Sequence, residues 1–88
     1  MAEVFILRLR LVPFLDTTGA NALRDIVKEC RSGGTKVIFS GVQPQPMELL
    51  RAMGLGANSP DLTHVAGYED AIALAYELRG LKPSANAA

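Results

Sequence analysis

A short polar cluster of Asp16, Thr17, Thr18 and Gly19 separates an apolar run from an amphipathic segment. At the start of a helix a threonine hydroxyl accepts a hydrogen bond from a first-turn N–H, and a carboxylate such as Asp16 favours the positive end of the helix dipole. Capping alone explains these residue types. The same N–H groups also favour an anion, so the helix would tolerate a phosphate esterified to Thr18, although Asp16 would repel it. Phosphorylation there would change what docks without unfolding the helix.

The remaining residues offer little catalytic chemistry. One histidine, His64, and one cysteine, Cys30, cannot build a zinc site, and Cys30 lies in an apolar helical stripe where a cysteine behaves as a small hydrophobe. The sequence has no phosphate-binding glycine loop, dinucleotide fingerprint or nucleophile elbow. Asp16, His64 and Glu69 are the titratable candidates for an enzyme, and no second convergent group accompanies them. We therefore predict no catalytic residue, no metal ion and no enzymatic activity.

The chain alternates between apolar runs typical of strands and three- to four-residue apolar spacing typical of helices. Gly33 and Gly34 end the first helix, since glycine adopts the left-handed C-cap conformation without a side-chain clash. Pro44 or Pro46 is acceptable in the first turn of the second helix. The predicted order alternates three strands with three helices. The strands are predicted at residues 4–12, 36–40 and near 63–65. The helices are predicted at residues 18–32, from the end of the loop 41–46 to about residue 53, and at 68–79.

The fold class predicted from this order is α/β with a mostly parallel sheet, because the short connections allow right-handed crossovers only. The loops that follow parallel strands emerge at one edge of the sheet, where partners and ligands usually bind. These loops are residues 13–18, 41–46 and 66–67. We therefore expect Thr18 to share an edge with a partner- or ligand-binding surface formed by Ser40, Gly41, Gln43 and Pro44.

Length and composition set limits on function. The chain has 88 residues, 49% of them apolar, which fits one domain with one core, predicted over residues 3–79. Nine basic residues balance nine acidic ones, so we expect no nucleic-acid partner. No apolar stretch approaches the ~20 residues of a membrane span, and a single cysteine suits a reducing cytoplasm. Residues 80–88 are small, polar and interrupted by proline, and we predict a flexible tail.

An apolar strand followed by Asp16, two small hydroxyl residues and Gly19 resembles the signature of the STAS family, which includes bacterial anti-sigma factor antagonists. In those antagonists the hydroxyl residue before the glycine is the phosphorylation switch, and Thr18 matches it. A longer similarity is to the C-terminal domain of bacterial SulP (sulfate-permease-type) anion transporters. It covers most of residues 4–79 and is carried by residues 12–19, 29–34, 37–46, 49–54 and 68–76.

The resemblance implies a regulatory or interaction domain at the cytoplasmic face of the bacterial inner membrane, with the transport chemistry in a transmembrane domain outside this chain. That transmembrane domain and a cytosolic protein are the implied partners, weak nucleotide binding is the implied ligand property, and no cofactor is expected. The alternative is a free-standing anti-sigma factor antagonist switched by a kinase at Thr18. Several hundred residues rich in apolar spans upstream of Val4 would favour the transporter; a few tens of soluble residues would favour the antagonist.

The start of the chain departs from the family pattern. STAS domains ordinarily begin with one or two further strands, and too few residues precede Val4 to form them. The first strand would then have an unpaired side, which invites pairing with another chain. We therefore predict a homo-oligomer, formed by dimerisation or strand exchange through residues 4–12.

Overall fold

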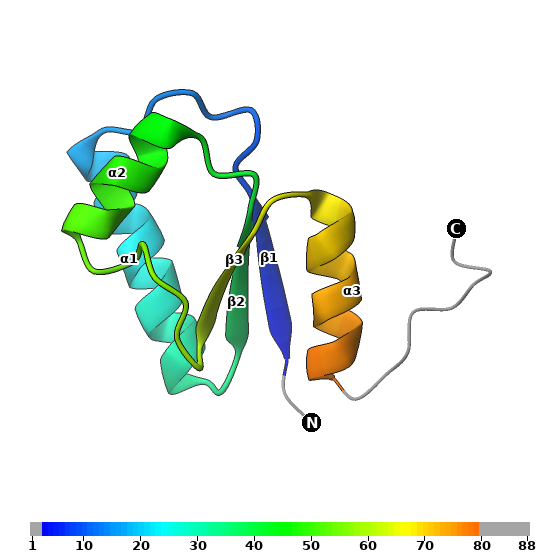
Figure 1. The fold of residues 1–88 in the computed structure, drawn as a ribbon. Coiled ribbons are helices and arrows are strands. Elements are labelled where there is room, and N and C mark those ends of the chain that lie inside the picture. Colours follow the sequence, from blue (N-terminus) through cyan, green and yellow to red (C-terminus); the bar gives the residue numbers. More distant parts are fainter. Residues whose placement is uncertain (1–2, 80–88) are drawn as a thin grey trace.

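The computed structural model describes residues 3–79, so the predicted tail at 80–88 lies outside the described residues. Three strands alternate with three helices, in the predicted order (Figure 1). The elements are β1 (Val4–Arg8), α1 (Thr17–Ser32), β2 (Lys36–Ser40), α2 (Pro44–Ala52), β3 (Leu62–Val65) and α3 (Tyr68–Leu78).

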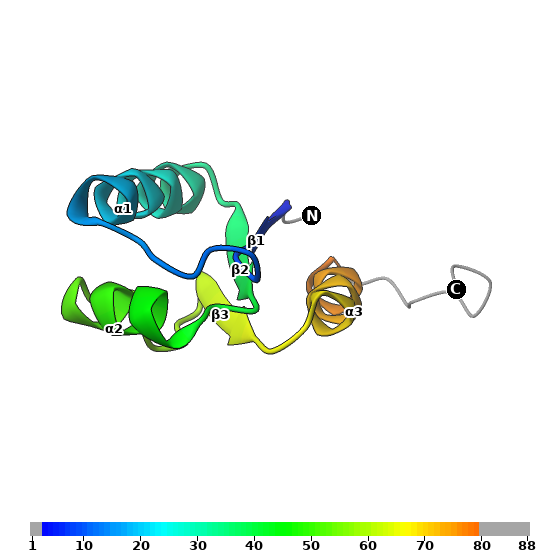
Figure 2. The same cartoon turned by 90° about the horizontal axis from the view of Figure 1, so that it is seen from above.

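The sheet is parallel throughout, with strand order β1-β2-β3. Val4 of β1 is in register with Lys36, and Val37 of β2 with Leu62. Helices α1 and α2 lie on one face of the sheet and α3 covers the other (Figures 1 and 2). The predicted α/β class and parallel sheet are confirmed, and within residues 3–79 no strand precedes β1.

The central strand β2 is buried along most of its length because helices cover both of its faces (Figure 2). Val37 and Phe39 are 1% and 0% exposed and pack in one cluster with Val27 of α1 and Leu50 of α2. Ile38, also 0% exposed, points to the opposite face by the two-residue alternation of a strand, towards α3. Each such side chain contributes about 1.5–3 kcal/mol by leaving water.

The first strand is shorter than predicted, ending at Arg8 instead of residue 12. Leu9 N still donates to Ser40 O at 2.9 Å, but Val12 N then bonds to Leu9 O at 3.1 Å and closes a turn. Leu11, within that turn, is 89% exposed. A strand forms only where a neighbouring strand pairs with it, and β2 ends at Ser40. The alternating sequence pattern continues to residue 12, but beyond Leu9 it has no neighbouring strand to pair with.

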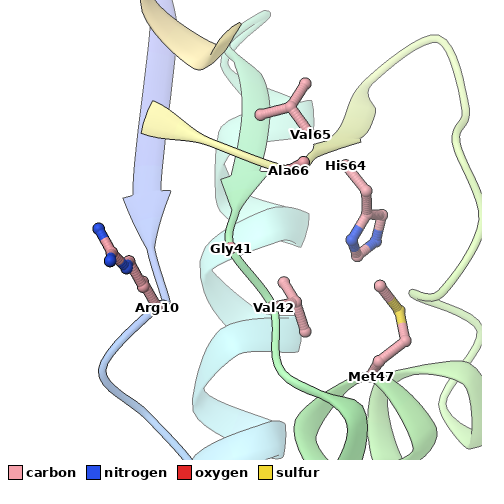
Figure 3. A pocket seen from close by; sticks show the side chains of 7 residues that line it. All are labelled: Arg10, Gly41, Val42, Met47, His64, Val65 and Ala66. Carbon is pink, nitrogen blue, oxygen red and sulfur yellow. The ribbon is translucent and has the colours of Figure 1, made fainter. Parts of the chain in front are cut away.

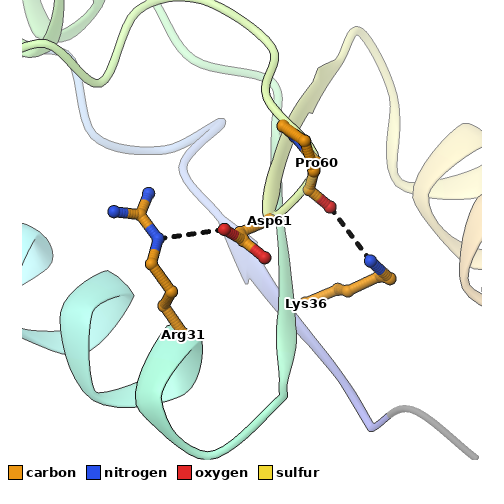
Figure 4. Close-up of polar contacts among 4 residues, drawn as sticks. All are labelled: Arg31, Lys36, Pro60 and Asp61. Carbon is orange, nitrogen blue, oxygen red and sulfur yellow. Dashed lines mark hydrogen bonds and ion pairs between the residues drawn. The ribbon is translucent and has the colours of Figure 1, made fainter.

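Two polar contacts hold the turn before β3, one from the end of α1 and one from the start of β2. Arg31 Nε lies 3.0 Å from Asp61 Oδ2, and Lys36 Nζ donates to Pro60 O at 3.0 Å (Figure 4). Both side chains of the ion pair are substantially exposed, so the pair stabilises the fold by less than about 1 kcal/mol. Its main effect is to fix the turn that precedes β3.

Candidate interaction site

The loop between β1 and α1 reaches the carboxyl edge of the sheet and ends in the predicted cap. Asp16 is the N-cap residue: its backbone is extended and its Oδ1 accepts a hydrogen bond from Gly19 N at 2.7 Å. The prediction that a threonine hydroxyl makes this bond is wrong. The helix begins at Thr17, one residue earlier than predicted, so both threonines are already helical and only Asp16 stands where a side chain reaches the first-turn N–H.

Close packing beneath the helix start turns both threonines outward. Thr17 and Thr18 are exposed, whereas Ala20 is fully buried. A Cβ atom at Gly19 would lie 2.9 Å from Leu15 Cδ1, a distance that would force a shift. The start of α1 thus lies close against the Leu15 side chain, whose end would have to move to admit a larger residue at Gly19.

Two glutamines fasten this loop to the loop that follows β2. Gln45, in the first turn of α2, accepts from Leu15 N at 2.7 Å and donates to Leu15 O at 3.0 Å. Gln43 Nε2 donates to Arg10 O at 2.5 Å. The loop that carries Thr18 and the loop that carries Gln43 thus lie side by side at the same edge. We call these two loops, residues 9–19 and 41–46, the rim.

The residues predicted for the second loop differ in exposure. Pro44 is exposed, and Gly41 and Gln43 are half-buried. Ser40 is 2% exposed and lines a cavity below the surface. Gly41 has φ +67°, and a Cβ there would lie 3.0 Å from Arg10 Cβ, so this close approach of the two loops requires glycine.

A shallow hollow of about 560 Å³ joins the second loop to the end of β3 (Figure 3). Met47 and His64 face each other across it, while the Arg10 side chain points away from both. The lining consists of Arg10, Gly41, Val42, Met47, His64, Val65 and Ala66.

His64 is held by contacts within the fold. Its Nε2 lies 2.7 Å from Leu55 O, and its backbone N donates to Asn58 Oδ1 at 2.9 Å. Its ring packs edge-on against Phe39, with the centroids 5.3 Å apart. Since a carbonyl oxygen only accepts, Nε2 is the donor in the contact with Leu55 O. Nδ1 is buried and has no hydrogen-bond partner within residues 3–79. His64 therefore fastens the segment before β3 to the sheet.

The family model of the STAS domain matches residues 2–66, a stretch that holds β1 to β3 and the whole rim. The chain belongs to the STAS family. Family membership indicates a regulatory or interaction role, and STAS domains are generally non-catalytic. Helix α3 lies beyond the matched residues. No match was found among curated proteins or among solved structures.

The titratable candidates of this STAS domain come from separate places. Asp16 caps α1, His64 belongs to β3 on the side of Leu55, and Glu69 is an exposed residue in the first turn of α3. Among the described residues no hydrogen bond or ion pair joins any two of the three. Between residues 3 and 79 no group of three or more histidine, cysteine, aspartate or glutamate side chains could hold a metal ion. No helix in that range is long and apolar enough to cross a bilayer.

The sequence patterns missed four residues at the rim or next to it. Leu11 and Phe14 are 89% and 68% exposed in the loop after β1. Arg8 and Arg10 line cavities at the same edge, and the Arg8 guanidinium lies 4.0 Å from the centroid of the Tyr68 ring. The alternating pattern of the first strand held no sign that Tyr68 of α3 packs against Arg8.

Proposed function

We propose that this STAS domain is the regulatory and interaction domain of a bacterial SulP-type anion transporter, acting at the cytoplasmic face of the inner membrane. Its partners are the transmembrane domain of the parent transporter and a cytosolic protein. The observation that supports this best is the paired hydrogen bonding of Gln45 to Leu15, which joins two loops into one rim that presents Thr17 and Thr18 to solvent.

A rim fixed before binding suits a protein that works by docking. When a partner binds a flexible loop, ordering the loop costs free energy. In the rim, hydrogen bonds from Gln45 to Leu15, 30 residues away, and from Gln43 to Arg10, 33 residues away, order the loop before a partner binds. Leu11 and Phe14, which are exposed in the same rim as the threonines, add apolar contact area. The rim thus combines apolar and hydroxyl groups in one fixed surface.

Thr18 favours a second candidate function, a free-standing anti-sigma factor antagonist switched by a kinase. Thr18 is exposed at the second position of α1, where a phosphate would meet free first-turn N–H groups. It would add close to two negative charges beside Asp16, which already bonds to Gly19 N. The surface potential of the rim would change while α1 stays folded.

The transporter proposal is tested in the intact gene product, with uptake of a labelled anion as the readout. We expect Thr18→Glu, which adds charge to the rim, to lower uptake at equal membrane abundance. Ala22→Glu is the matched control, because Ala22 is exposed on the same helix beyond its first turn. A gene product without membrane-spanning segments, or equal uptake by both variants, would contradict the proposal.

The antagonist proposal is tested with the cognate kinase and labelled ATP. Wild type should incorporate one phosphate and Thr18→Ala none, with Thr17→Ala as the neighbouring control. Label that persists in Thr18→Ala would move the site elsewhere.

We further propose that β1 mediates homo-dimerisation. Glu3 O and Leu9 N bond to β2, each at 2.9 Å, so the alternate residues Val4, Ile6 and Arg8 direct their backbone groups to the open side. Ile6→Pro removes one outward N–H and no bond to β2, whereas Ile6→Val keeps it. Light scattering at high concentration should give a dimer for wild type and Ile6→Val, and a monomer for Ile6→Pro. A monomeric wild type would refute the proposal.

A further inference from the structure

Two arginines line a cavity at the carboxyl edge of the sheet, on the side covered by α3. Arg8 ends β1 and Arg10 follows two residues later. The cavity has a volume of about 170 Å³. A second hollow of about 300 Å³, lined by Arg8, Arg10 and Leu11, lies beside it. The lining of the first cavity is Arg8, Arg10, Ser40, Gly41, Ala66, Gly67 and Tyr68.

Neither arginine is neutralised by a carboxylate within residues 3–79, where the ion pairs are Arg24 with Asp25 and Arg31 with Asp61. A guanidinium stays charged at any physiological pH, so the cavity wall carries two positive charges. The ring of Tyr68 lies 4.0 Å from the Arg8 guanidinium carbon, a cation–π contact that holds this charge in place.

The other lining groups are small or polar. Ser40, only 2% exposed, provides a buried hydroxyl-bearing residue at the cavity wall. Gly41 and Gly67 also line the cavity and contribute no side chains to it. In the first turn of α3 the carboxylate of Asp70 accepts from Gly67 N at 3.3 Å, and neither Asp70 nor Glu69 lines the cavity.

We propose that Arg8, Arg10 and Ser40 form a binding site for a tetrahedral oxyanion, a phosphate or sulfate group. Guanidinium forks match such oxygens with paired, charge-assisted hydrogen bonds. The cavity, with a volume of about 170 Å³, has room for such an anion together with a few water molecules. The neighbouring hollow at Leu11 gives room for the molecule that carries the anion. The site does not depend on the transporter assignment.

The test is calorimetric titration of the full 88-residue chain with inorganic phosphate, sulfate and phenyl phosphate. We expect dissociation constants below about 10 mM, weakened at least about tenfold by Arg10→Gln and by Arg8→Gln. Arg10→Lys, which keeps the charge but loses the fork, should lie between. Arg24→Gln is the matched control, since it makes the same change of net charge on exposed α1. Circular dichroism confirms that each variant is folded.

The three probes distinguish the source of the anion. Tighter binding of phenyl phosphate than of inorganic phosphate assigns the site to an esterified phosphate, and equal binding assigns it to the free anion. The proposal is overturned if no probe binds wild type at about 50 mM, or if Arg24→Gln weakens binding as much as Arg10→Gln.

Discussion

Replacing Gln45 with alanine should release the β1–α1 loop from α2. The substitution removes two hydrogen bonds to Leu15, of 2.7 and 3.0 Å, in a half-buried setting. A hydrogen bond contributes about 1 kcal/mol net, and a buried amide left without a partner costs about 1–3 kcal/mol. Because the loop is only half-buried and water will reach part of it, we expect a loss of about 2–3 kcal/mol.

Urea unfolding followed by circular dichroism measures this loss. With a slope of about 1 kcal/mol per molar for a chain of this size, the midpoint should fall by about 2–3 M in Gln45→Ala. Gln43→Ala is the matched control: it removes one exposed bond, to Arg10 O, which water replaces at a cost below about 1 kcal/mol. Gln45→Glu accepts from Leu15 N but cannot donate to Leu15 O, so it should lose at least half as much as Gln45→Ala.

The reasoning is refuted if Gln45→Ala and Gln43→Ala shift the midpoint equally. Hydrogen exchange of the Leu15 amide provides an independent measurement, because it should speed up in Gln45→Ala and stay unchanged in Gln43→Ala. An unchanged exchange rate in both variants would mean that the rim is not fixed by this side chain.

Three further predictions concern the stability of the elements that position the rim, each measured by urea unfolding. Asp16→Ala should cost about 1 kcal/mol through loss of the N-cap and Thr18→Ala less than about 0.5 kcal/mol; equal losses would contradict capping by the carboxylate. Gly41→Ala should lower the free energy of unfolding more than Gly34→Ala. Both glycines have positive φ, which costs alanine about 1–2 kcal/mol, but only at Gly41 does a neighbouring side chain lie 3.0 Å from the added Cβ. Equal losses in the two variants would disprove that contact. His64→Phe keeps a packing ring but loses the 2.7 Å bond to the segment before β3, so it should cost about 1–2 kcal/mol, and full stability would show that the bond contributes nothing.

Strand β2 illustrates what local pattern predicts well. The run from Lys36 to Ser40 lies between glycines, and the structure has the same bounds. Strand β1 illustrates the opposite. Its alternation of apolar and polar residues continues to residue 12, but the strand ends at Arg8 because the neighbouring strand β2 ends at Ser40. The sequence pattern assigned the capping hydrogen bond to a threonine hydroxyl, but the extended backbone at Asp16 makes Asp16 the N-cap residue, and its carboxylate accepts that bond.

The kind and order of the elements were determined by the sequence alone, since periodicity, glycines and prolines act over a few residues. The contacts that make the rim and the arginine cavity were decided only by the tertiary structure. Gln45 meets Leu15 across 30 residues, and Arg8 meets Tyr68 from the other end of the chain. Such neighbours depend on where each strand ends and on which face each crossover helix packs, and no local pattern encodes either.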